Sequence, residues 1–321
     1  MEIQKVLSRF RQFGGFRLLL EYIRMGIGLR VLHHALLYLV GKEPRETAYA
    51  YIKEAVNKKL NERYLPYLKE RKAYYDSLQL QQVRSNKVWT CWLQGFDKAP
   101  EIVRVCQESL KRQLKPDREL IQLDDTNYQQ YVTLPTHIVE RYKRGQMPPA
   151  HFSDILRLEL LTRYGGTWMD ASILCTGRHH SPEMLDSDLF IFQQIVYGDW
   201  TFHGISNWFI TSCTNNRILL VLRDMLCKYW NDYSVTLNYY IFHSFFRTLA
   251  GMYPDDIAAM TLKDRNYPLM LNDRLNEPYD PEWTRELTSR VCFHKICCRI
   301  YPDILANKTN FYHAIINGTI A

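Results

Sequence analysis

Apolar and polar positions alternate in a recognisable order through the middle of the chain. Residues 88–93 are mostly apolar and end at a Gln-Gly pair, a pattern that indicates a buried strand. Residues 99–114 carry apolar side chains at helical spacing, and 119–123 repeats the strand pattern. Strand, helix and strand in this order predict an α/β fold with a largely parallel sheet. Ligands of such sheets bind beyond the carboxyl ends of the strands, where Trp92 and Asp124 follow.

A further strand pattern lies downstream and ends in a carboxylate. The sequence predicts a helix near 136–144 and another over 153–164, which a Gly-Gly pair terminates. Residues 167–169 then form a short strand, and Asp170 follows it directly. The remaining pattern predicts a strand near 189–195, a loop over 198–207, and helices near 216–231 and 237–250.

The N-terminal part of the chain has a different, helical pattern. Residues 1–40 show helical spacing with a break at Gly14-Gly15, and the pattern stops near Pro44. Charged helix continues over 45–82. The sequence therefore predicts an N-terminal helical region over 1–82 and an α/β domain over 83–321.

Charge adds a contrast between these two parts. The net charge is +7, and residues 1–41 hold six basic and two acidic side chains, which leaves +3 for the other 280 residues. A nucleic-acid-binding domain carries its basic patch within the folded domain, so this distribution argues against nucleic acid as a partner. Basic residues interleaved with Phe and Leu are typical of a helix that lies in a membrane interface. We expect residues 1–41 to bind an anionic membrane surface; packing of the same apolar face on the rest of the protein is the alternative.

The lack of a membrane-spanning segment and of a signal-peptide pattern bears on the expected cellular location. The most apolar N-terminal stretch, 18–40, is interrupted by Glu21, Arg24 and Arg30, so no segment offers the ~20 apolar residues that span a bilayer. No signal-peptide pattern begins the sequence, and the eight cysteines form no CxxC pair, which favours reduced thiols. We therefore expect a cytoplasmic protein that lies at the inner face of the cell membrane without crossing it.

Asp154 and Arg157 are the most unusual charged residues of the predicted helix 153–164. On a helical wheel both lie within the apolar arc, whereas Glu159, Thr162 and Arg163 gather on the opposite side. One interpretation is an ordinary salt bridge between residues three apart. The other is a ligand-binding pair, because charges drawn into the interior are costly unless they meet partners.

The chemistry of these positions suits a sugar nucleotide. A carboxylate at a strand end, Asp170, can hold sugar hydroxyls or a divalent ion that bridges the diphosphate. The arginine fork of Arg157 can bind hydroxyls or phosphate in fixed geometry. Trp92 can stack on the base.

The segment that contains these residues is Ser153-Asp154-x-x-Arg157-x-x-x-Leu161-x-x-Tyr164-Gly165-Gly166-Thr167-Trp168-Met169-Asp170-Ala171-Ser172. It resembles the signature of the DXD sugar-binding glycosyltransferases, in particular the capsular polysaccharide synthesis branch of family 32. Weaker support comes from Trp89-x-x-Trp92-x-Gln94-Gly95, Asn207-Trp208-Phe209-Ile210 and Tyr239-x-x-x-His243-x-x-Phe246. The resemblance covers about residues 85–300. It implies a GT-A-like, Rossmann-type sheet flanked by helices, a UDP-sugar donor, Mn²⁺ or Mg²⁺, and transfer to a glycan or lipid-linked acceptor with retention of anomeric configuration.

The same resemblance assigns roles to single residues. Trp92 matches the tryptophan that stacks on uracil, Asp154 and Arg157 match the pair that grips the donor, and Asp170 matches the first aspartate of the motif. The chain departs from the stricter pattern at Ser172, where a second, metal-binding aspartate is usual. His294 in the C-terminal segment is a candidate second metal ligand beside Asp170.

Two other functions remain open from the sequence. Asp154 and Asp170 could flank a glycosidic bond in a hydrolase. The general acid of such an enzyme needs a raised carboxyl pKa, however, and Arg157 would lower the pKa of a neighbouring carboxyl group. Because Ser172 stands where the second aspartate is usual, an inactive scaffold that binds nucleotide sugars is the other alternative. No Ser-His-Asp, phosphate-loop or dinucleotide-binding pattern is present.

Overall fold

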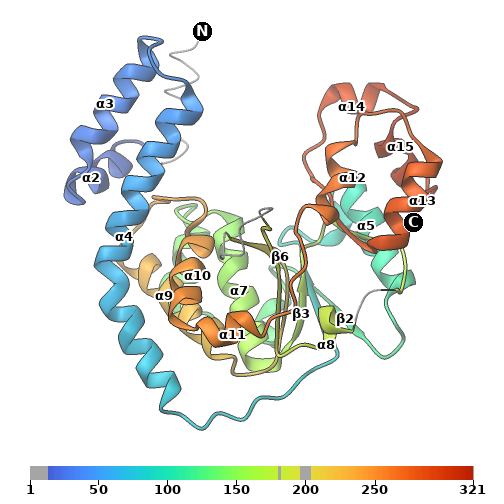
Figure 1. The fold of residues 1–321 in the computed structure, drawn as a ribbon, viewed down its shortest axis with the longest axis horizontal. Helices are drawn as coiled ribbons and strands as arrows, with labels where there is room; N and C mark the ends of the chain where they lie inside the picture. The colour runs from blue at the N-terminus through green and yellow to red at the C-terminus, as the bar shows by residue number, and fades with distance from the viewer. Residues whose placement is uncertain (1–13, 180–181, 196–203, 321) are drawn as a thin grey trace. The chain divides into compact units, whose positions relative to one another are not determined.

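The computed structural model describes residues 14–320, apart from 180–181 and 196–203 (Figure 1). Its internal contacts divide the chain into two compact units. Unit 1 comprises Met1–Gln79, Leu134–Leu156 and Leu220–Met252. Unit 2 comprises Leu80–Thr133, Arg157–Leu219 and Tyr253–Ala321. The first boundary lies three residues before the one expected after residue 82, and two later segments join the N-terminal helices in unit 1.

A five-stranded sheet forms the centre of unit 2, in the order β2-β1-β3-β6-β5. The strands β1, β2 and β3 pair in parallel, β6 runs antiparallel to β3, and β5 runs antiparallel to β6. Four strands therefore point the same way, and the expected α/β fold with a largely parallel sheet is confirmed. The bounds are β1 Lys87–Cys91, β2 Glu119–Leu123, β3 Gly166–Met169, β5 Leu189–Gln193 and β6 Ile205–Ser212.

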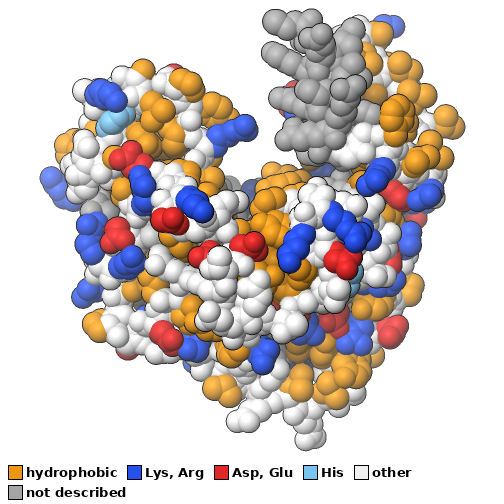
Figure 2. All heavy atoms as spheres, turned by 180° about the vertical axis from the view of Figure 1, so that it is seen from behind, with side chains coloured by type: hydrophobic (Ala, Val, Ile, Leu, Met, Phe, Trp, Pro, Cys, Tyr) orange, Lys and Arg blue, Asp and Glu red, His pale blue; other side chains and the backbone are white. Residues whose placement is uncertain are grey.

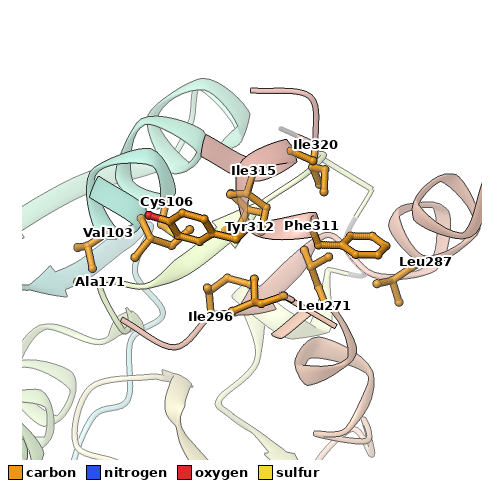
Figure 3. Packing of buried hydrophobic residues seen from close by; sticks show 14 of the residues in the cluster. Val103, Cys106, Ala171, Leu271, Leu287, Ile296, Phe311, Tyr312, Ile315 and Ile320 are labelled. Atoms are coloured by element: carbon orange, nitrogen blue, oxygen red, sulfur yellow. The ribbon is translucent and has the colours of Figure 1, made fainter. Parts of the chain in front are cut away.

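A small second sheet and several helices complete unit 2. The strands β4 (Ile173–Cys175) and β7 (Phe293–Lys295) pair antiparallel. Side chains of α5, β4 and the C-terminal helices form one buried cluster, in which Tyr312 points toward Cys106 and Val103 while Phe311 points toward Leu287 (Figure 3). The helices are α5 Glu101–Gln113, α8 Glu183–Asp186, α11 Pro254–Ala258, α12 Met270–Asp273, α13 Pro281–Arg290, α14 Pro302–Ala306 and α15 Phe311–Ile316, and short 3₁₀ turns cover 96–98, 128–130 and 267–269.

The Gly165-Gly166 pair is required where the chain turns into β3. Both residues have positive φ, at 65° and 91°. A Cβ on Gly166 would lie 2.3 Å from the carbonyl oxygen of Lys87, and one on Gly165 would lie 3.0 Å from that of Ser212. Only glycine satisfies both constraints at once, so the pair fixes how β3 enters the sheet between β1 and β6.

Unit 1 is helical, and its longest helix, α4 (Arg45–Asp76), is the charged helix expected from the sequence. Its buried residues Val56, Leu60, Tyr64 and Leu68 recur every four positions and form one stripe. The Tyr64 ring packs edge-on against Phe245 of α10, with ring centroids 5.7 Å apart. The other helices of unit 1 are α2 Phe16–Arg24, α3 Gly28–Leu39, α6 Thr136–Lys143 and α10 Ile241–Met252, whereas α7 Pro149–Tyr164 and α9 Arg217–Asp232 each cross a unit boundary.

Several sequence expectations need correction. The helix α7 begins at Pro149 rather than at residue 153, because proline is well tolerated in the first helical turn. The expected loop over 198–207 lies partly outside the described residues, and its last three residues belong to β6. Thr162 does not face solvent: it is buried, and its Oγ1 donates to the carbonyl oxygen of Leu158 at 2.7 Å.

The expected burial of two charged residues is confirmed. Asp154 and Arg157 are both buried, as their place in the apolar arc predicts. The eight cysteines are free thiols. Among the described residues, no helix is both long and apolar enough to cross a membrane. Residues 1–13, which hold three of the six N-terminal basic side chains, lie outside the described part of the chain.

Candidate functional site

Three parallel strands bring the first site residues to one edge of the sheet. The strand β1 lies between β2 and β3, with Trp89 opposite Trp168 and Cys91 opposite Leu123. Trp92, Asp124 and Asp170 directly follow these strands. All three therefore lie at the carboxyl edge, where α/β sheets bind ligands.

Asp170 is the centre of the polar contacts at this edge. Its backbone N–H donates to the carbonyl oxygen of Trp208 on β6 at 2.9 Å. Its Oδ1 accepts from Trp168 Nε1 at 2.9 Å and lies 3.5 Å from Arg157 Nη2, and its Oδ2 lies 3.1 Å from Lys295 Nζ. Burial alone raises the pKa of Asp170, but Lys295, Arg157 and the indole N–H outweigh it and hold that pKa below its usual range. The carboxylate is therefore ionised at neutral pH.

Arg157 lies beneath this carboxylate. Its guanidinium donates through Nη1 to the backbone carbonyl oxygen of Asn207 and lies 4.9 Å from the ring centroid of Trp168. The side chain is only 5% exposed. Arg157 can therefore orient the Asp170 carboxylate, and its contact with a donor stays a prediction.

Lys295 is the site residue that the sequence did not identify. Its Nζ donates to Ser172 Oγ at 2.7 Å while pairing with Asp170, so it bridges the two polar side chains of the Asp-Ala-Ser segment. The Lys295 side chain is 23% exposed and that of Asp170 is 26% exposed. No local pattern could have revealed the contact, because Ser172 and Lys295 are 123 residues apart.

Gln107 of α5 holds the same segment from behind. It is buried, its Nε2 donates to the carbonyl oxygen of Ala171 at 2.8 Å, and its Oε1 accepts from Gln122 on β2 at 2.9 Å. In the sequence, this glutamine comes one helical turn after Val103, on the apolar face of the helix, and that position could have indicated a buried, hydrogen-bonded side chain. Gln107 therefore holds the backbone of the segment Asp170–Ser172 in place.

Trp92 lies just beyond β1 and is half-buried against the cluster of Figure 3. Its backbone N–H donates to the carbonyl oxygen of Leu123 at 3.0 Å. Its indole Nε1 is buried and has no hydrogen-bond partner among the described residues. An unpaired buried donor is unusual in a folded protein, and Trp230 Nε1 is another within the described residues.

Asp124 is partly exposed, whereas Asp154 is buried. Asp124 accepts from the backbone N–H and hydroxyl of Thr126 at 2.8 and 2.6 Å, so it closes a turn, and these bonds lower the pKa of its carboxyl group. Its charge and that of Asp170 still reach Cys91 at the end of β1, whose thiol pKa is raised to about 12, mainly by burial. Asp154 lies one helical turn before Arg157 on α7 and is buried.

His294 and Asp170 do not form a metal-binding group. His294 is fully buried in β7, its Nε2 lies 3.1 Å from Thr176 Oγ1, and burial lowers its pKa to about 4. Successive side chains of a strand point to opposite faces, so Lys295 faces Asp170 while His294 faces away. Within the ranges that the structure describes, no three His, Cys, Asp or Glu side chains are grouped to hold a metal ion.

The weaker sequence signals fall in different places. Asn207 and Trp208 offer backbone carbonyl oxygens to Arg157 and Asp170, so this motif borders the site. Tyr239, His243 and Phe246 belong to unit 1. Of the predicted site residues, the structure therefore brings Arg157, Asp170 and Ser172 into one connected group and adds Lys295 to it.

Comparisons with known proteins identify the family of the chain. No curated protein gives a significant match. One solved structure, "PaToxG Glycosyltransferase", is similar over 64% of this chain and 83% of its own, with 14% sequence identity and a TM-score of 0.39. The family model described as capsular polysaccharide synthesis protein matches residues 38–315, which is well over half of the chain. The chain therefore belongs to the capsular polysaccharide synthesis protein family.

Proposed function

We propose that the protein is a retaining glycosyltransferase that moves a sugar from a UDP-sugar to a hydroxyl group of a glycan or lipid-linked acceptor. The observation that carries this proposal is an ionised carboxylate, Asp170, held at the carboxyl edge of the sheet between Arg157 and Lys295. Membership of a capsular polysaccharide synthesis family supports the choice of a glycan product. The retained configuration and the uridine nucleotide come from the resemblance of the segment Ser153–Ser172 to DXD enzymes.

The reaction breaks the bond between the anomeric carbon and the β-phosphate oxygen, and the electron pair leaves with UDP. The acceptor oxygen forms the new bond and passes its proton to the departing diphosphate. Negative charge therefore develops on the diphosphate, and preorganised cations are the groups that stabilise it most. Lys295 is accessible enough to contact that diphosphate, while Asp170 can accept hydrogen bonds from donor hydroxyl groups.

Trp92 fits the base end of the donor. Trp92 follows β1 at the carboxyl edge of the sheet, where Asp170 follows β3, and its buried indole N–H has no partner among the described residues. Stacking of a base on an aromatic ring contributes about 1–3 kcal/mol. We assign Trp92 to uracil binding; for Asp154, the role of gripping the donor rests on the resemblance of its segment alone.

The two alternatives, a glycoside hydrolase and an inactive scaffold, differ from a transferase in the pKa needed at Asp170 and in the products formed. A general acid in a glycoside hydrolase needs a raised pKa, whereas the pKa of Asp170 is lowered by its two cations. An inactive scaffold would bind UDP-sugar without releasing UDP. Incubation of the full-length protein with a panel of UDP-sugars and an oligosaccharide acceptor tests all three, with UDP release, nucleotide-free hydrolysis and product configuration as readouts. Hydrolysis without nucleotide, or binding without turnover, would contradict a transferase.

We also propose that residues 1–41 attach the protein to the cytoplasmic face of an anionic membrane. The exposed residues Leu29, Leu32, Leu36 and Leu39 recur along one stripe of α3, and Leu29 is 85% exposed. Phe16, Leu20 and Ile23 form a similar exposed stripe on α2. Figure 2 shows hydrophobic side chains gathered with Lys and Arg at the upper right of the view, in this unit. Exposed leucines beside basic side chains suit an interfacial helix.

A further inference from the structure

The contacts of Asp170 leave no suitable place for the divalent ion that the motif implies. Oδ1 accepts from Trp168 and faces Arg157, and Oδ2 faces the Lys295 ammonium group. Mg²⁺ or Mn²⁺ binds oxygen at about 2.1 Å, so an ion on Oδ2 would lie within about 5 Å of that ammonium group. Two positive charges would then repel each other beside a single carboxylate.

The other expected ligands are also occupied. Ser172 Oγ accepts a hydrogen bond from Lys295, and His294 points to the opposite face of β7, toward Thr176. The donor set that remains is poor in the oxygen ligands that these hard cations require. The residues therefore do not fit a metal ion held by the Asp-Ala-Ser segment.

Lys295 itself stands where such an ion would be expected, between the first and third residues of the motif. We propose that Lys295 is a built-in cation that replaces the divalent ion and stabilises the departing diphosphate, so that transfer is independent of added metal. This inference rests on the proposed glycosyltransferase function. An ammonium group has three donors; in the described part of the chain, Asp170 and Ser172 take two of them, which leaves one for a phosphate oxygen.

The backbone holds Lys295 in register with the motif. In the small sheet, Ile173 pairs with Lys295 and Leu174 pairs with His294. The backbone N–H of Ile296 donates to the carbonyl oxygen of Ser172 at 3.0 Å. The lysine is thus attached by backbone hydrogen bonds to the loop whose side chains it contacts, as a preorganised electrostatic group should be.

The first test uses the unmodified full-length protein and a panel of UDP-sugars. UDP release is measured after EDTA treatment and again with added Mn²⁺ or Mg²⁺. We expect turnover within twofold under both conditions, and UDP affinity by calorimetry that is equally insensitive to Mn²⁺. Turnover that appears only with metal, or a tenfold gain in UDP affinity with Mn²⁺, would overturn the inference and leave the proposed function intact. No UDP release from any donor under either condition would overturn the proposed function and the inference with it.

Variants then test the lysine directly. In EDTA, Lys295→Ala should lower turnover at least 100-fold, in the range that loss of one preorganised stabilising group produces. Lys295→Arg keeps the charge and should remain within about tenfold of the unmodified protein. Lys308→Ala removes an exposed lysine of the same C-terminal segment and should change nothing. Thermal unfolding identifies any variant that fails to fold, and wild-type-like turnover of folded Lys295→Ala would refute the role.

Discussion

Each unit of the molecule contains a carboxylate between two cations. In unit 1, Asp224 of α9 binds Arg71 Nη2 at 2.6 Å and Arg223 Nη2 at 2.9 Å, and it accepts from the hydroxyl of Tyr75 at 2.8 Å. In unit 2, Asp170 lies between Arg157 and Lys295. The local chemistry is nearly the same, yet we assign only the second carboxylate to a reaction.

The two carboxylates differ in the structural elements that carry their cationic partners. Arg71 and Tyr75 are on α4, so Asp224 joins two helices, and its side chain is 15% exposed. Asp170 ends a strand, more of its side chain is open, and its lysine arrives on a separate strand. A carboxylate between cations does not indicate a site by itself; we assign Asp170 to a reaction because it lies at the carboxyl edge of a sheet.

The largest expected effect separates these two carboxylates. Asp170→Asn removes the charge that organises Lys295 and the donor, and we expect at least a 100-fold loss of UDP release. Its melting temperature should change little, because the amide keeps the shape of the side chain. The measurement pairs a UDP-release assay with thermal unfolding.

Asp224→Asn is the matched control. It weakens several hydrogen bonds to charged partners, so we expect a loss of about 1–3 kcal/mol in the free energy of unfolding with normal turnover of the folded fraction. If Asp170→Asn instead unfolded the protein while Asp224→Asn abolished turnover, the two assignments would be reversed.

A second contrast concerns two tryptophans. Trp92 and Trp230 both have a buried indole N–H without a partner among the described residues, but Trp230 is fully buried in unit 1. Trp92→Ala should weaken UDP binding by about 1–3 kcal/mol and raise KM more than it lowers kcat. Trp230→Phe should lower stability and leave UDP affinity unchanged. Unchanged UDP affinity of Trp92→Ala by calorimetry would show that Trp92 serves only the core.

A third contrast compares the apolar stripes of α3 and α4. Leu36 is exposed, whereas Leu60 is fully buried. Leu36→Ser should reduce co-sedimentation with anionic vesicles several-fold without loss of stability, while Leu60→Ser should destabilise unit 1. Vesicle binding should also weaken near 1 M salt, where the Debye length falls to ~3 Å. Binding that resists both high salt and Leu36→Ser would refute the interfacial attachment.

The smallest effect is expected at Ser172. Ser172→Ala removes one neutral acceptor from Lys295 and leaves the ion pair with Asp170 in place. Loss of one such hydrogen bond costs about 1 kcal/mol, so turnover should fall by less than tenfold. A loss as large as that of Asp170→Asn would mean that the hydroxyl group contacts the donor directly.

The parts of the site that lie close together in the sequence were predictable. Helical spacing revealed that Asp154 and Arg157 are buried, and the Gly-Gly turn placed Asp170 at a strand end. Lys295 was not predictable, because an isolated lysine in a three-residue strand carries no signal of its partner. The strand β6 was missed for a related reason: its residues are buried along most of their length and show no alternation that would mark a strand.

The separation of Ser172 and Lys295 also has a consequence for biosynthesis. The ribosome must add 123 further residues after Ser172 before the lysine exists. At ~5–20 residues per second, this delay lasts roughly 6–25 s. During that interval the nascent chain can already contain the whole Asp-Ala-Ser segment and most of the central sheet, but not the ammonium group. A growing chain is therefore expected to remain inactive toward sugar nucleotides until synthesis of its last strand.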